Sequence, residues 1–399
     1  MNNLLNQNLI LRGKKILLRI DLNVPMKNGA ITETSRIEKI LPTIKLLIEK
    51  EAKIIILSHI GRPKGKIVEG MSLEPISKKI SEFLNKEVLF DKNQINENTI
   101  SKINKISNGS IMMLENIRFN EGEEINDKEF SKKIASLGDI YINDAFSCSH
   151  RAHASMEGIT KHISSYFGLQ ITEEINALKR ITSEIKKPIT LIIGGSKIST
   201  KIKIIKNLIK KFDDIIIVGG MANTMLKYTG SKIGKSIYEH DCEDLIKEIL
   251  EKSKSYNCQI NSPIDVVVSK KFDWVGKNKD INEIEEDEMI LDIGPKTIYS
   301  IKEIINNSNT VLWNGPAGYF ENPNFENGTK KILEIITEKT VKNKIFSVAG
   351  GGETVAAINK FKKSDSFTFV STAGGAFLEY LEGKTLPGIK ALNSNVRTK

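Results

Sequence analysis

The stretch from Tyr141 to Ser155 concentrates groups that can do chemistry. An apolar run ends there, and the candidates that follow it are Asp144, Cys148, His150, Arg151 and His153. Carboxylate, thiolate and imidazole groups can bind zinc, and a thiol beside an imidazole can act as a nucleophile. Two histidines and an arginine can instead line a site for an anion. The stretch therefore allows three kinds of site.

The anion site is favoured over the other two. The spacing of Asp144, Cys148, His150 and His153 matches no closed zinc site, and the positive charge of Arg151 would repel a cation. Cys148 and His150 stand two positions apart, where side chains rarely align for proton transfer. We therefore expect His150 and His153 to supply positive charge or hydrogen bonds, and Arg151 to bind the anion.

Arginine is rare in this chain, which makes its positions informative. The 399 residues include 59 lysines and arginines, of which only eight are arginines. Four of them stand beside turn-like or polar sequence in the first half: Arg36, Arg62, Arg118 and Arg151. A guanidinium group binds carboxylate or phosphate through two parallel hydrogen bonds. These four arginines are therefore predicted to bind one anionic ligand.

Short apolar runs precede these polar residues. Strands are predicted over 15–20, 54–57, 111–114 and 140–142, with helical spacing of apolar residues between them, as in 36–50 and 76–84. Strands that alternate with amphipathic helices indicate a parallel α/β sheet, whose ligands bind at the carboxyl ends of the strands. A polar residue at one strand end is usually a cap, but four in succession favour a shared site.

Glycines follow the predicted strands of the second half. A helix over 173–186 separates the halves, and the alternation of strands and helices then resumes with runs at 190–193, 215–218, 265–268, 289–293, 311–313, 346–349 and 369–370. Glycine at a strand end lets backbone N–H groups approach a phosphate, and the dipole of the next helix adds to the attraction. The second half is therefore predicted to bind phosphate largely through its backbone.

Composition argues against several other classes. A hydrophobic content of 40% and a charged content of 27% are typical of a globular protein. The net charge of +10 invites nucleic-acid binding, but the lysines are spread among acidic residues without a basic aromatic stripe. No apolar run approaches the roughly 18 residues that a membrane span needs. Three widely spaced cysteines and no evident signal peptide predict a cytoplasmic location.

Phosphate-binding motifs of other families fail at single positions. Gly230–Ser236 and Gly61–Lys66 each have one residue too few for a P-loop, and Gly350-Gly351-Gly352 lacks the spacing of a dinucleotide fingerprint. The chain is therefore predicted to bind phosphate by another arrangement.

Motifs along nearly the whole chain resemble those of the phosphoglycerate kinase family. In chain order they are RIDLNVP (19–25), LSHIGRP (57–63), LENIRF (114–119), NDAF (143–146), HRAHAS (150–155), GGMANT (219–224), DIGP (292–295), WNGP (313–316) followed by Phe320-Glu321, and LEGKTLPG (381–388). So many long motifs in one order are highly specific. The resemblance implies reversible in-line phosphoryl transfer between 1,3-bisphosphoglycerate and MgADP, giving 3-phosphoglycerate and MgATP in glycolysis.

The resemblance also implies an α/β fold of two Rossmann-like, doubly wound parallel-sheet domains, joined by a helical hinge with the substrate cleft between them. The implied divisions are a 3-phosphoglycerate-binding domain over 1–170, an interdomain helix over 171–187, a nucleotide-binding domain over 188–380, and a segment over 381–399 that returns to the first domain.

Residue roles follow from the same motifs. The resemblance assigns the transfer step to Arg36 and Lys197, which would hold the moving phosphoryl group. The implied glycerate ligands are Asp21, Asn23, Arg36, His59, Arg62, Arg118, His150 and Arg151. The implied nucleotide ligands are Lys201, Asn314, Glu321, Gly350, Gly351, Gly352, Glu353 and Thr354, with Glu321 on the ribose and Glu353 on the Mg²⁺ of the nucleotide. We expect a cytoplasmic monomer whose partners are these small molecules, without nucleic acid or membrane.

Three positions depart from the family pattern. Glu353 stands where the family usually has Asp, Thr200 replaces an Asp in the turn between Lys197 and Lys201, and Ala373 replaces the first glycine of a triple-glycine turn. None removes a group assigned to the transfer step. Three rival hypotheses remain: a paralogue that binds the same ligands without turnover, another two-domain α/β enzyme such as an NAD-binding dehydrogenase, and a nucleic-acid-binding protein. Assays of turnover, of NAD binding and of salt-dependent retention on DNA separate them.

Overall fold

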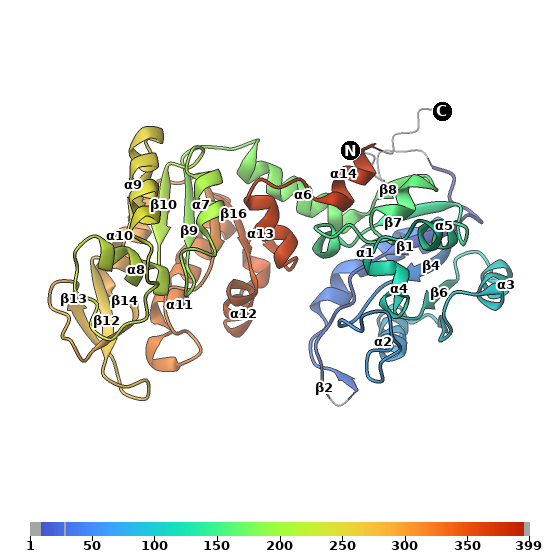
Figure 1. Cartoon of the computed structure of the whole chain (residues 1–399), viewed down its shortest axis with the longest axis horizontal. Coiled ribbons are helices and arrows are strands. Elements are labelled where there is room, and N and C mark those ends of the chain that lie inside the picture. Colours follow the sequence, from blue (N-terminus) through green and yellow to red (C-terminus); the bar gives the residue numbers. More distant parts are fainter. Residues whose placement is uncertain (1–8, 28, 395–399) are drawn as a thin grey trace. The chain divides into compact units, whose positions relative to one another are not determined.

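The computed structural model describes residues 9–27 and 29–394, and the chain divides into two units (Figure 1). Unit 1 takes its described residues from Met1–Asn176 and Thr385–Lys399, and unit 2 is Ala177–Lys384. Each unit is an α/β layer structure of its own.

A six-stranded parallel sheet forms the centre of unit 1. Its strands are short apolar runs, and the inner ones, β6, β4, β1 and β7, are buried on both faces, as is usual where helices cover a parallel sheet on both sides. The spatial order is β5-β6-β4-β1-β7-β8. The bounds are β1 (Lys15–Arg19), β4 (Lys53–Leu57), β5 (Val88–Asp91), β6 (Ile111–Leu114), β7 (Ile140–Asn143) and β8 (Ser165–Phe167).

Helices pack on this sheet through apolar stripes. In α1, Ile37, Ile40 and Ile44 recur at helical spacing and are buried in the core against the strands. The helices are α1 (Ser35–Glu49), α2 (Glu74–Leu84), α3 (Glu97–Lys105), α4 (Glu121–Glu124), α5 (Lys128–Ala135) and α14 (Pro387–Ser394); the 3₁₀ turns are η2 (Ile117–Phe119), η3 (Phe146–Cys148) and η4 (Gly158–Lys161). A small hairpin, β2 (Met26–Lys27) with β3 (Ala30–Ile31), precedes α1.

Unit 2 repeats the same plan. Its parallel sheet has the order β11-β10-β9-β15-β16-β17. The bounds are β9 (Ile189–Ile193), β10 (Asp214–Ile217), β11 (Gln259–Asn261), β15 (Thr310–Asn314), β16 (Phe346–Gly350) and β17 (Phe369–Ser371). The helices are α7 (Ile202–Leu208), α8 (Gly220–Tyr228), α9 (Glu243–Tyr256), α10 (Pro295–Asn306), α11 (Asn327–Val341), α12 (Gly352–Lys360) and α13 (Gly375–Leu381). These two sheets confirm the predicted α/β class.

Two predicted strands lie outside the parallel sheet of unit 2. The runs at 265–268 and 289–293 form β12 (Asp265–Ser269) and β14 (Met289–Ile293), which pair antiparallel in a separate sheet with β13 (Lys277–Asp280). The expected alternation is therefore wrong over this segment. The connections between these strands are short and contain no helix. The chain therefore folds back on β12 and pairs antiparallel, because a parallel pair needs a longer crossover connection.

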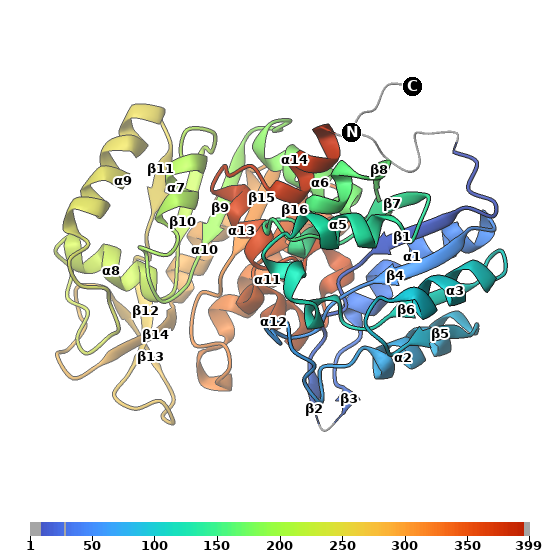
Figure 2. The same ribbon diagram turned by 45° about the vertical axis from the view of Figure 1, so that its right-hand side comes forward.

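The helix between the two halves is α6 (Leu169–Thr182), which begins and ends about one turn earlier than the predicted 173–186. The last described helix, α14, belongs to unit 1, where it packs against β8 (Figures 1 and 2). Its Gly388 N–H donates to the Ser149 carbonyl at 2.9 Å. The segment from Thr385 onward thus completes the unit that the first 176 residues begin.

In each sheet, the order in which strands are added reverses direction at one inner strand, β1 in unit 1 and β9 in unit 2. The chain leaves β1 toward β4 on one side and later returns to β7 on the other, and in unit 2 it leaves β9 toward β10 and returns to β15. In open α/β sheets, ligands bind beyond the carboxyl ends of the strands at such points. Among the helices of the described residues, none combines the length and apolar character that crossing a bilayer requires.

Candidate active site

Asp21, just after β1, organises the polar end of the unit 1 sheet. Its Oδ2 accepts hydrogen bonds from Arg36 Nη1 and from Ser147 Oγ, each at 2.5 Å. Arg36 stands in the first turn of α1, and Ser147 lies in the turn after β7. One carboxylate therefore joins three elements and fixes the Arg36 guanidinium at the sheet edge.

A second set of bonds joins the loops after β1, β4 and β6. Asn23 Oδ1 accepts a hydrogen bond from the Gly61 N–H at 2.9 Å, and Arg118 Nη1 donates to the Gly61 carbonyl at 2.8 Å. The Arg118 carbonyl in turn accepts from the Gly65 N–H at 3.2 Å. Gly61 has a positive φ of 64°, a conformation that glycine adopts without a steric penalty. The predicted ligands Asn23 and Arg118 are thereby brought to one place.

His59, just after β4, is buried beneath these groups. Arg19 Nη2 lies 3.2 Å from its Nδ1, and Cys148 Sγ lies 3.9 Å from both ring nitrogens. Burial lowers the pKa of His59 well below its ordinary value, and the positive charges of Arg19 and Arg118 lower it further. Burial likewise raises the pKa of the Cys148 thiol. Neither group is therefore charged near neutral pH.

The same positive field acts on His153. Burial lowers its pKa to about 3, and the charges of Arg118, Arg19 and Arg151 contribute in the same direction. Of the two contributions expected from His153, positive charge or hydrogen bonds, an uncharged ring leaves hydrogen bonds. Burial lowers the pKa of Arg118, and the charges of Arg19 and, to a smaller extent, Arg151 act in the same direction.

The remaining predicted glycerate ligands differ in their surroundings. His150 and Arg151 are half-buried beside His153, whereas Arg62 stands on the loop after β4. Asp144, a candidate metal ligand by its residue type, faces elsewhere: its carboxylate accepts hydrogen bonds from the Thr43 hydroxyl and from the Ile171 N–H.

A different trio has ligand-type atoms near one another. Asp21, His59 and Cys148 offer one oxygen, nitrogen and sulfur within 4.8 Å. The Asp21 carboxylate is already paired with Arg36, the Cys148 thiol resists ionisation, and the arginine charges oppose a cation. The histidine ring that lies beside the Cys148 thiol is that of His59, at 3.9 Å. The groups at this edge suit an anion.

In unit 2 the predicted nucleotide ligands meet at the ends of β9, β15 and β16. Lys201 Nζ donates to Asn314 Oδ1 at 2.6 Å, and Asn314 Nδ2 donates to the Gly350 carbonyl at 2.6 Å. Thr354 Oγ1 accepts from the Gly315 N–H at 2.7 Å. Burial lowers the pKa of Lys201, although the charge of Glu353 opposes this shift. These contacts bring together Lys201, Asn314, Gly350 and Thr354.

The glycines between them leave the backbone open. Gly351, with φ of 98°, precedes α12, and a Cβ built on it would lie 2.4 Å from Asn314 Nδ2. Gly352 begins α12, and a Cβ there would meet nothing within 4 Å. The first N–H groups of this nine-residue helix are therefore accessible to a phosphate. Lys197 is exposed in the turn after β9, where the Thr200 hydroxyl donates to its carbonyl at 2.8 Å.

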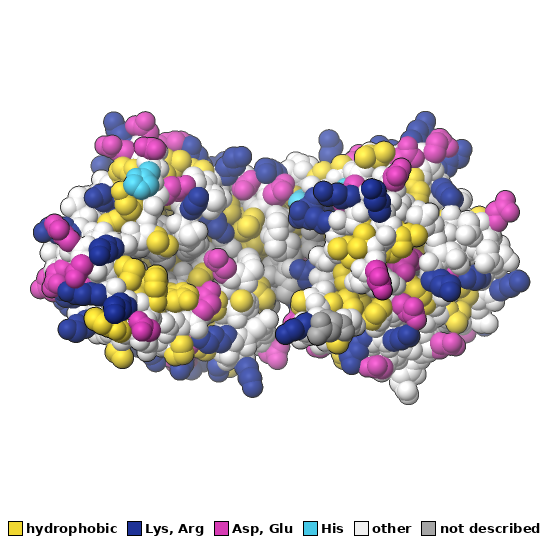
Figure 3. Space-filling model, turned by 60° about the horizontal axis from the view of Figure 1, so that its bottom comes forward, with side chains coloured by type: hydrophobic (Ala, Val, Ile, Leu, Met, Phe, Trp, Pro, Cys, Tyr) yellow, Lys and Arg dark blue, Asp and Glu magenta, His cyan; other side chains and the backbone are white. Residues whose placement is uncertain are grey.

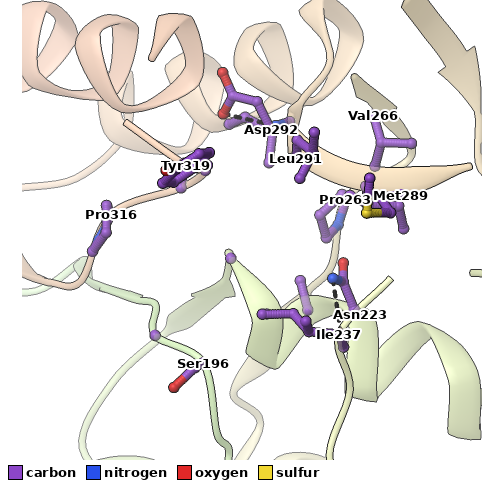
Figure 4. Close-up of a pocket in the computed structure, with 18 of the residues that line it drawn as sticks. Ser196, Asn223, Ile237, Pro263, Val266, Met289, Leu291, Asp292, Pro316 and Tyr319 are labelled. Atoms are coloured by element: carbon purple, nitrogen blue, oxygen red, sulfur yellow. Dashed lines mark hydrogen bonds between the residues drawn. The ribbon is translucent and has the colours of Figure 1, made fainter. Parts of the chain in front are cut away.

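A cavity of about 330 Å³ opens beside these glycines (Figure 4). The turns after β9 and β10 line it with Gly195, Ser196, Gly219 and Gly220, and two predicted ligands, Glu321 and Glu353, also line it. Apolar side chains form the remaining wall: Ile237, Pro263, Val266, Met289, Leu291, Pro316 and Tyr319. Asp292 also borders it, but its carboxylate accepts from the Gly328 N–H at 2.6 Å. The cavity therefore combines an apolar wall with glycine-rich turns.

Sequence reasoning missed two parts of the site. The apolar wall was missed because its side chains come from many segments and read singly as ordinary core. Arg19 was missed although it carried a signal, because a charged residue inside an apolar strand requires buried partners. Its partners, His59 and Ser155, lie 40 and 136 positions away along the chain.

Comparisons with known proteins converge on one family. A family model described as Phosphoglycerate kinase matches residues 6–384. A phosphoglycerate kinase of Chelativorans sp. (strain BNC1) is 47% identical over 382 residues, covering 95% of this chain and 96% of the relative. Among solved structures, one of phosphoglycerate kinase from Coxiella burnetii aligns with a TM-score of 0.90 at 40% identity over 98% of both chains. One from Pyrococcus horikoshii OT3 aligns with a TM-score of 0.84 at 30% identity over 99% of both chains.

Proposed function

The chain belongs to the phosphoglycerate kinase family, and on that basis we propose how its two half-sites divide the work. Its reaction is the reversible transfer of a phosphoryl group between 1,3-bisphosphoglycerate and ADP, which gives 3-phosphoglycerate and ATP in glycolysis. It is thus a phosphotransferase that acts on a carboxyl group. The roles of individual residues are our proposals.

The observation that carries the glycerate assignment is the positive field at the edge of the unit 1 sheet. Burial lowers the pKa values of His59 and His153, and the charges of Arg19 and Arg118 lower both further, so these guanidinium groups make the site cationic without a proton on either ring. A glycerate ligand has a carboxylate at one end and a phosphate at the other. We assign its binding to Asp21, Asn23, Arg36, His59, Arg62, Arg118, His150 and Arg151.

The transfer step needs positioning and charge stabilisation more than an activated nucleophile. The attacking oxygen of ADP is already anionic, and the acyl phosphate is a reactive donor. Arg36 from unit 1 and Lys197 from unit 2 would stabilise the charge of the moving phosphoryl group. Because these residues belong to different units, transfer requires that the two units close on each other.

The cavity of unit 2 suits the nucleoside. Its apolar wall would hold the base, and Glu321 would hold the ribose hydroxyls. The N–H groups at the start of α12, with Lys201, Asn314 and Thr354 behind them, would receive the phosphates. Mg²⁺ bound to the nucleotide neutralises phosphate charge, and the exposed carboxylate of Glu353 in the first turn of α12 is a hard oxygen ligand that fits it.

A coupled assay tests the proposal directly. ATP and 3-phosphoglycerate are supplied, and formation of the acyl phosphate is followed through a reducing enzyme. We expect turnover that depends on both substrates. Thermal stabilisation by both ligands without turnover would instead show a binding paralogue.

The metal assignment has its own test. Glu353→Asp keeps the carboxylate but shortens its reach, so we expect the Mg²⁺ dependence of kcat to change more than the KM of either substrate. A metal profile identical to that of the unchanged protein would remove Glu353 as a ligand.

We also propose that the enzyme acts as a cytoplasmic monomer without nucleic acid or membrane. On the face shown in Figure 3, lysines and arginines lie interspersed with acidic side chains. Light scattering should give the chain mass of 44.6 kDa across a range of concentrations. A concentration-dependent mass, or salt-sensitive retention on DNA, would contradict this proposal.

A further inference from the structure

Arg19 is a fully buried arginine whose guanidinium is held on three sides. It lies at the end of β1 with 0% exposure. Its Nε donates to Ser155 Oγ at 2.9 Å, its Nη1 to the Ile20 carbonyl at 2.7 Å, and its Nη2 lies 3.2 Å from His59 Nδ1. The side chain therefore cannot turn away from His59 without breaking two other bonds.

A buried carboxyl group lies next along this set of hydrogen bonds: burial raises the pKa of Glu123, and the charge of Arg19 opposes that shift. Glu123 is 0% exposed and accepts hydrogen bonds from Ser155 Oγ at 2.6 Å and from the Ser155 N–H at 2.9 Å. Ser155 thus accepts from Arg19 and donates to Glu123. A buried charge needs this kind of compensation, and a chain of fixed hydrogen bonds keeps the guanidinium in one orientation.

The chemistry of the Arg19–His59 contact permits one tautomer. A guanidinium has N–H donors and no acceptor, and it stays protonated in proteins. His59 Nδ1 must therefore present its lone pair to Nη2. The single ring proton of a neutral imidazole is then on Nε2.

The groups that face His59 favour the neutral ring. Burial acts first, the positive charges are Arg19 on β1, Arg118 on η2 and Arg36 on α1, and the uncharged neighbours are His153 and the Cys148 thiol at 3.9 Å. A carboxylate also lies close: an oxygen of Asp21 is within 4.8 Å of a ring nitrogen. That carboxylate is already paired with Arg36. A second proton on the ring would point at the guanidinium and add to the positive field.

We propose that Arg19 is a positioning residue that locks His59 as the Nε2–H tautomer, so that His59 serves the glycerate ligand as a neutral hydrogen-bond donor. The role assigned to the ligand rests on the proposed function, whereas the tautomer does not. The hydrogen bond from His59 would then orient the anion, while the arginines would supply the positive charge that attracts it. Binding of the glycerate would not depend on protonation of this histidine.

The first test needs no variant for its readout. In ¹⁵N-labelled protein, long-range proton–nitrogen spectra distinguish protonated from unprotonated ring nitrogens. The chain has only five histidines, and His59→Gln identifies the ring that disappears. We expect a protonated Nε2 and an unprotonated Nδ1 from about pH 5.5 to about pH 8, a range that lies on both sides of the ordinary histidine pKa. A proton on Nδ1, or a doubly protonated ring in this range, would overturn the proposal.

A matched pair of variants tests the donor role. The amide of His59→Gln can donate where Nε2–H does, whereas His59→Met has a similar length and no donor. We expect the 3-phosphoglycerate KM to rise about 10-fold or more in His59→Met and less than half as much in His59→Gln, with the ATP KM unchanged in both. Equal effects of the two variants would refute the donor role.

Arg19→Gln tests the lock. We expect it to mix the His59 tautomers and raise the 3-phosphoglycerate KM while the ATP KM stays the same. Unchanged tautomer signals in a folded Arg19→Gln variant would refute the positioning role. If this variant does not fold, the wild-type spectrum still tests the tautomer, and the comparison of His59→Met with His59→Gln still tests the donor role. If the wild-type protein shows no turnover, the proposed function fails, while the spectrum still judges the tautomer.

Discussion

At the residue scale, the glycerate half-site is held in place by its own charged groups. The Asp21–Arg36 pair is largely shielded, with side-chain exposures of 12% and 29%, and Ser147 shares the carboxylate. Removing Arg36 therefore leaves Asp21 with a hydroxyl and a backbone N–H as partners, so the site should keep its shape. This allows the catalytic role of Arg36 to be measured separately from folding.

Arg36→Ala and Lys197→Ala should each lower kcat by roughly 10² or more while binding of the glycerate or the nucleotide persists, because we propose that both charges act on the moving phosphoryl group. Steady-state kinetics and ligand titrations measure the two effects. Arg12→Ala and Lys203→Ala are matched controls on exposed residues of the same units, and they should leave kcat within about twofold. A near-normal kcat in either test variant would remove the role assigned to that residue.

Asp144 offers a pH-dependent prediction. Burial raises its pKa to about 6, above the roughly 3.9 of an unfolded aspartate. Between these values the folded chain holds a proton that the unfolded chain releases, so this group's contribution to stability is full below about pH 4 and is lost as the pH rises through about 6. Relative to the unchanged protein, Asp144→Asn should therefore gain stability between about pH 4 and about pH 7, by about 3 kcal/mol at most.

Urea unfolding of both proteins at several pH values provides the measurement. The Thr43 hydroxyl can turn to accept from the new amide, so any cost of the substitution itself is a constant offset. A stability difference that does not change with pH would show that the pKa of Asp144 is the same in the folded and unfolded chains.

Residue types alone predict much of the site. Four rare arginines and the glycines after strands indicate two anion-binding halves, because guanidinium groups and open backbone have few other uses at strand ends. The protonation of His153 cannot be predicted in this way. Burial lowers its pKa most, and the fold brings two further contributors, Arg118 and Arg19, from elsewhere in the chain.

At the element scale, the turn between β16 and α12, in the proposed nucleotide half-site, has a position that only glycine fits. Gly351 combines a φ of 98° with the close approach of Asn314. A side chain there would meet both backbone strain and a collision.

Gly351→Ala should therefore raise the ATP KM by at least about 10-fold and lower the free energy of unfolding, because the Asn314 amide must move away from Gly350 and Lys201. Gly230→Ala is a matched control, with φ of 96° and nothing within 4 Å of the new Cβ. In this control, backbone strain should lower the free energy of unfolding by about 1 kcal/mol, and the ATP KM should stay unchanged. Equal KM values in the two variants would remove the collision as the cause.

Strand and helix patterns predict the parallel sheets well and the antiparallel sheet poorly. Apolar runs such as 190–193 and 311–313 are buried on both faces, and their composition reflects that burial. The strand at Lys277–Asp280 is wholly polar and has no such signal. Its pairing with β12 depends on the course of the chain, which the local sequence does not determine.

At the scale of the whole molecule, α14 should stabilise unit 1 rather than unit 2. Leu392 is 0% exposed in this helix, and Leu386 just before it is also buried. Leu392→Ala should lower the stability of unit 1 by about 2–5 kcal/mol, the usual cost of truncating a buried leucine. Asn393→Ala, on the exposed face of the same helix, should have little effect.

Hydrogen exchange can assign the loss to one unit. Amides of β7 and β8 should exchange faster in Leu392→Ala, while those of β9 and β15 keep their protection. Faster exchange in both sheets alike would show that the helix supports the whole chain as one cooperative structure.

The split of unit 1 between the two ends of the chain has a consequence during synthesis on the ribosome. Unit 2 occupies one continuous stretch, from Ala177 to Lys384, whereas Ser149 receives its partner Gly388 more than two hundred residues after it has been made. At roughly 5–20 residues per second, that delay is roughly 10 to 50 s. During this interval the edge of the sheet at β8 lacks its covering helix, and the growing chain can complete the nucleotide half before the glycerate half.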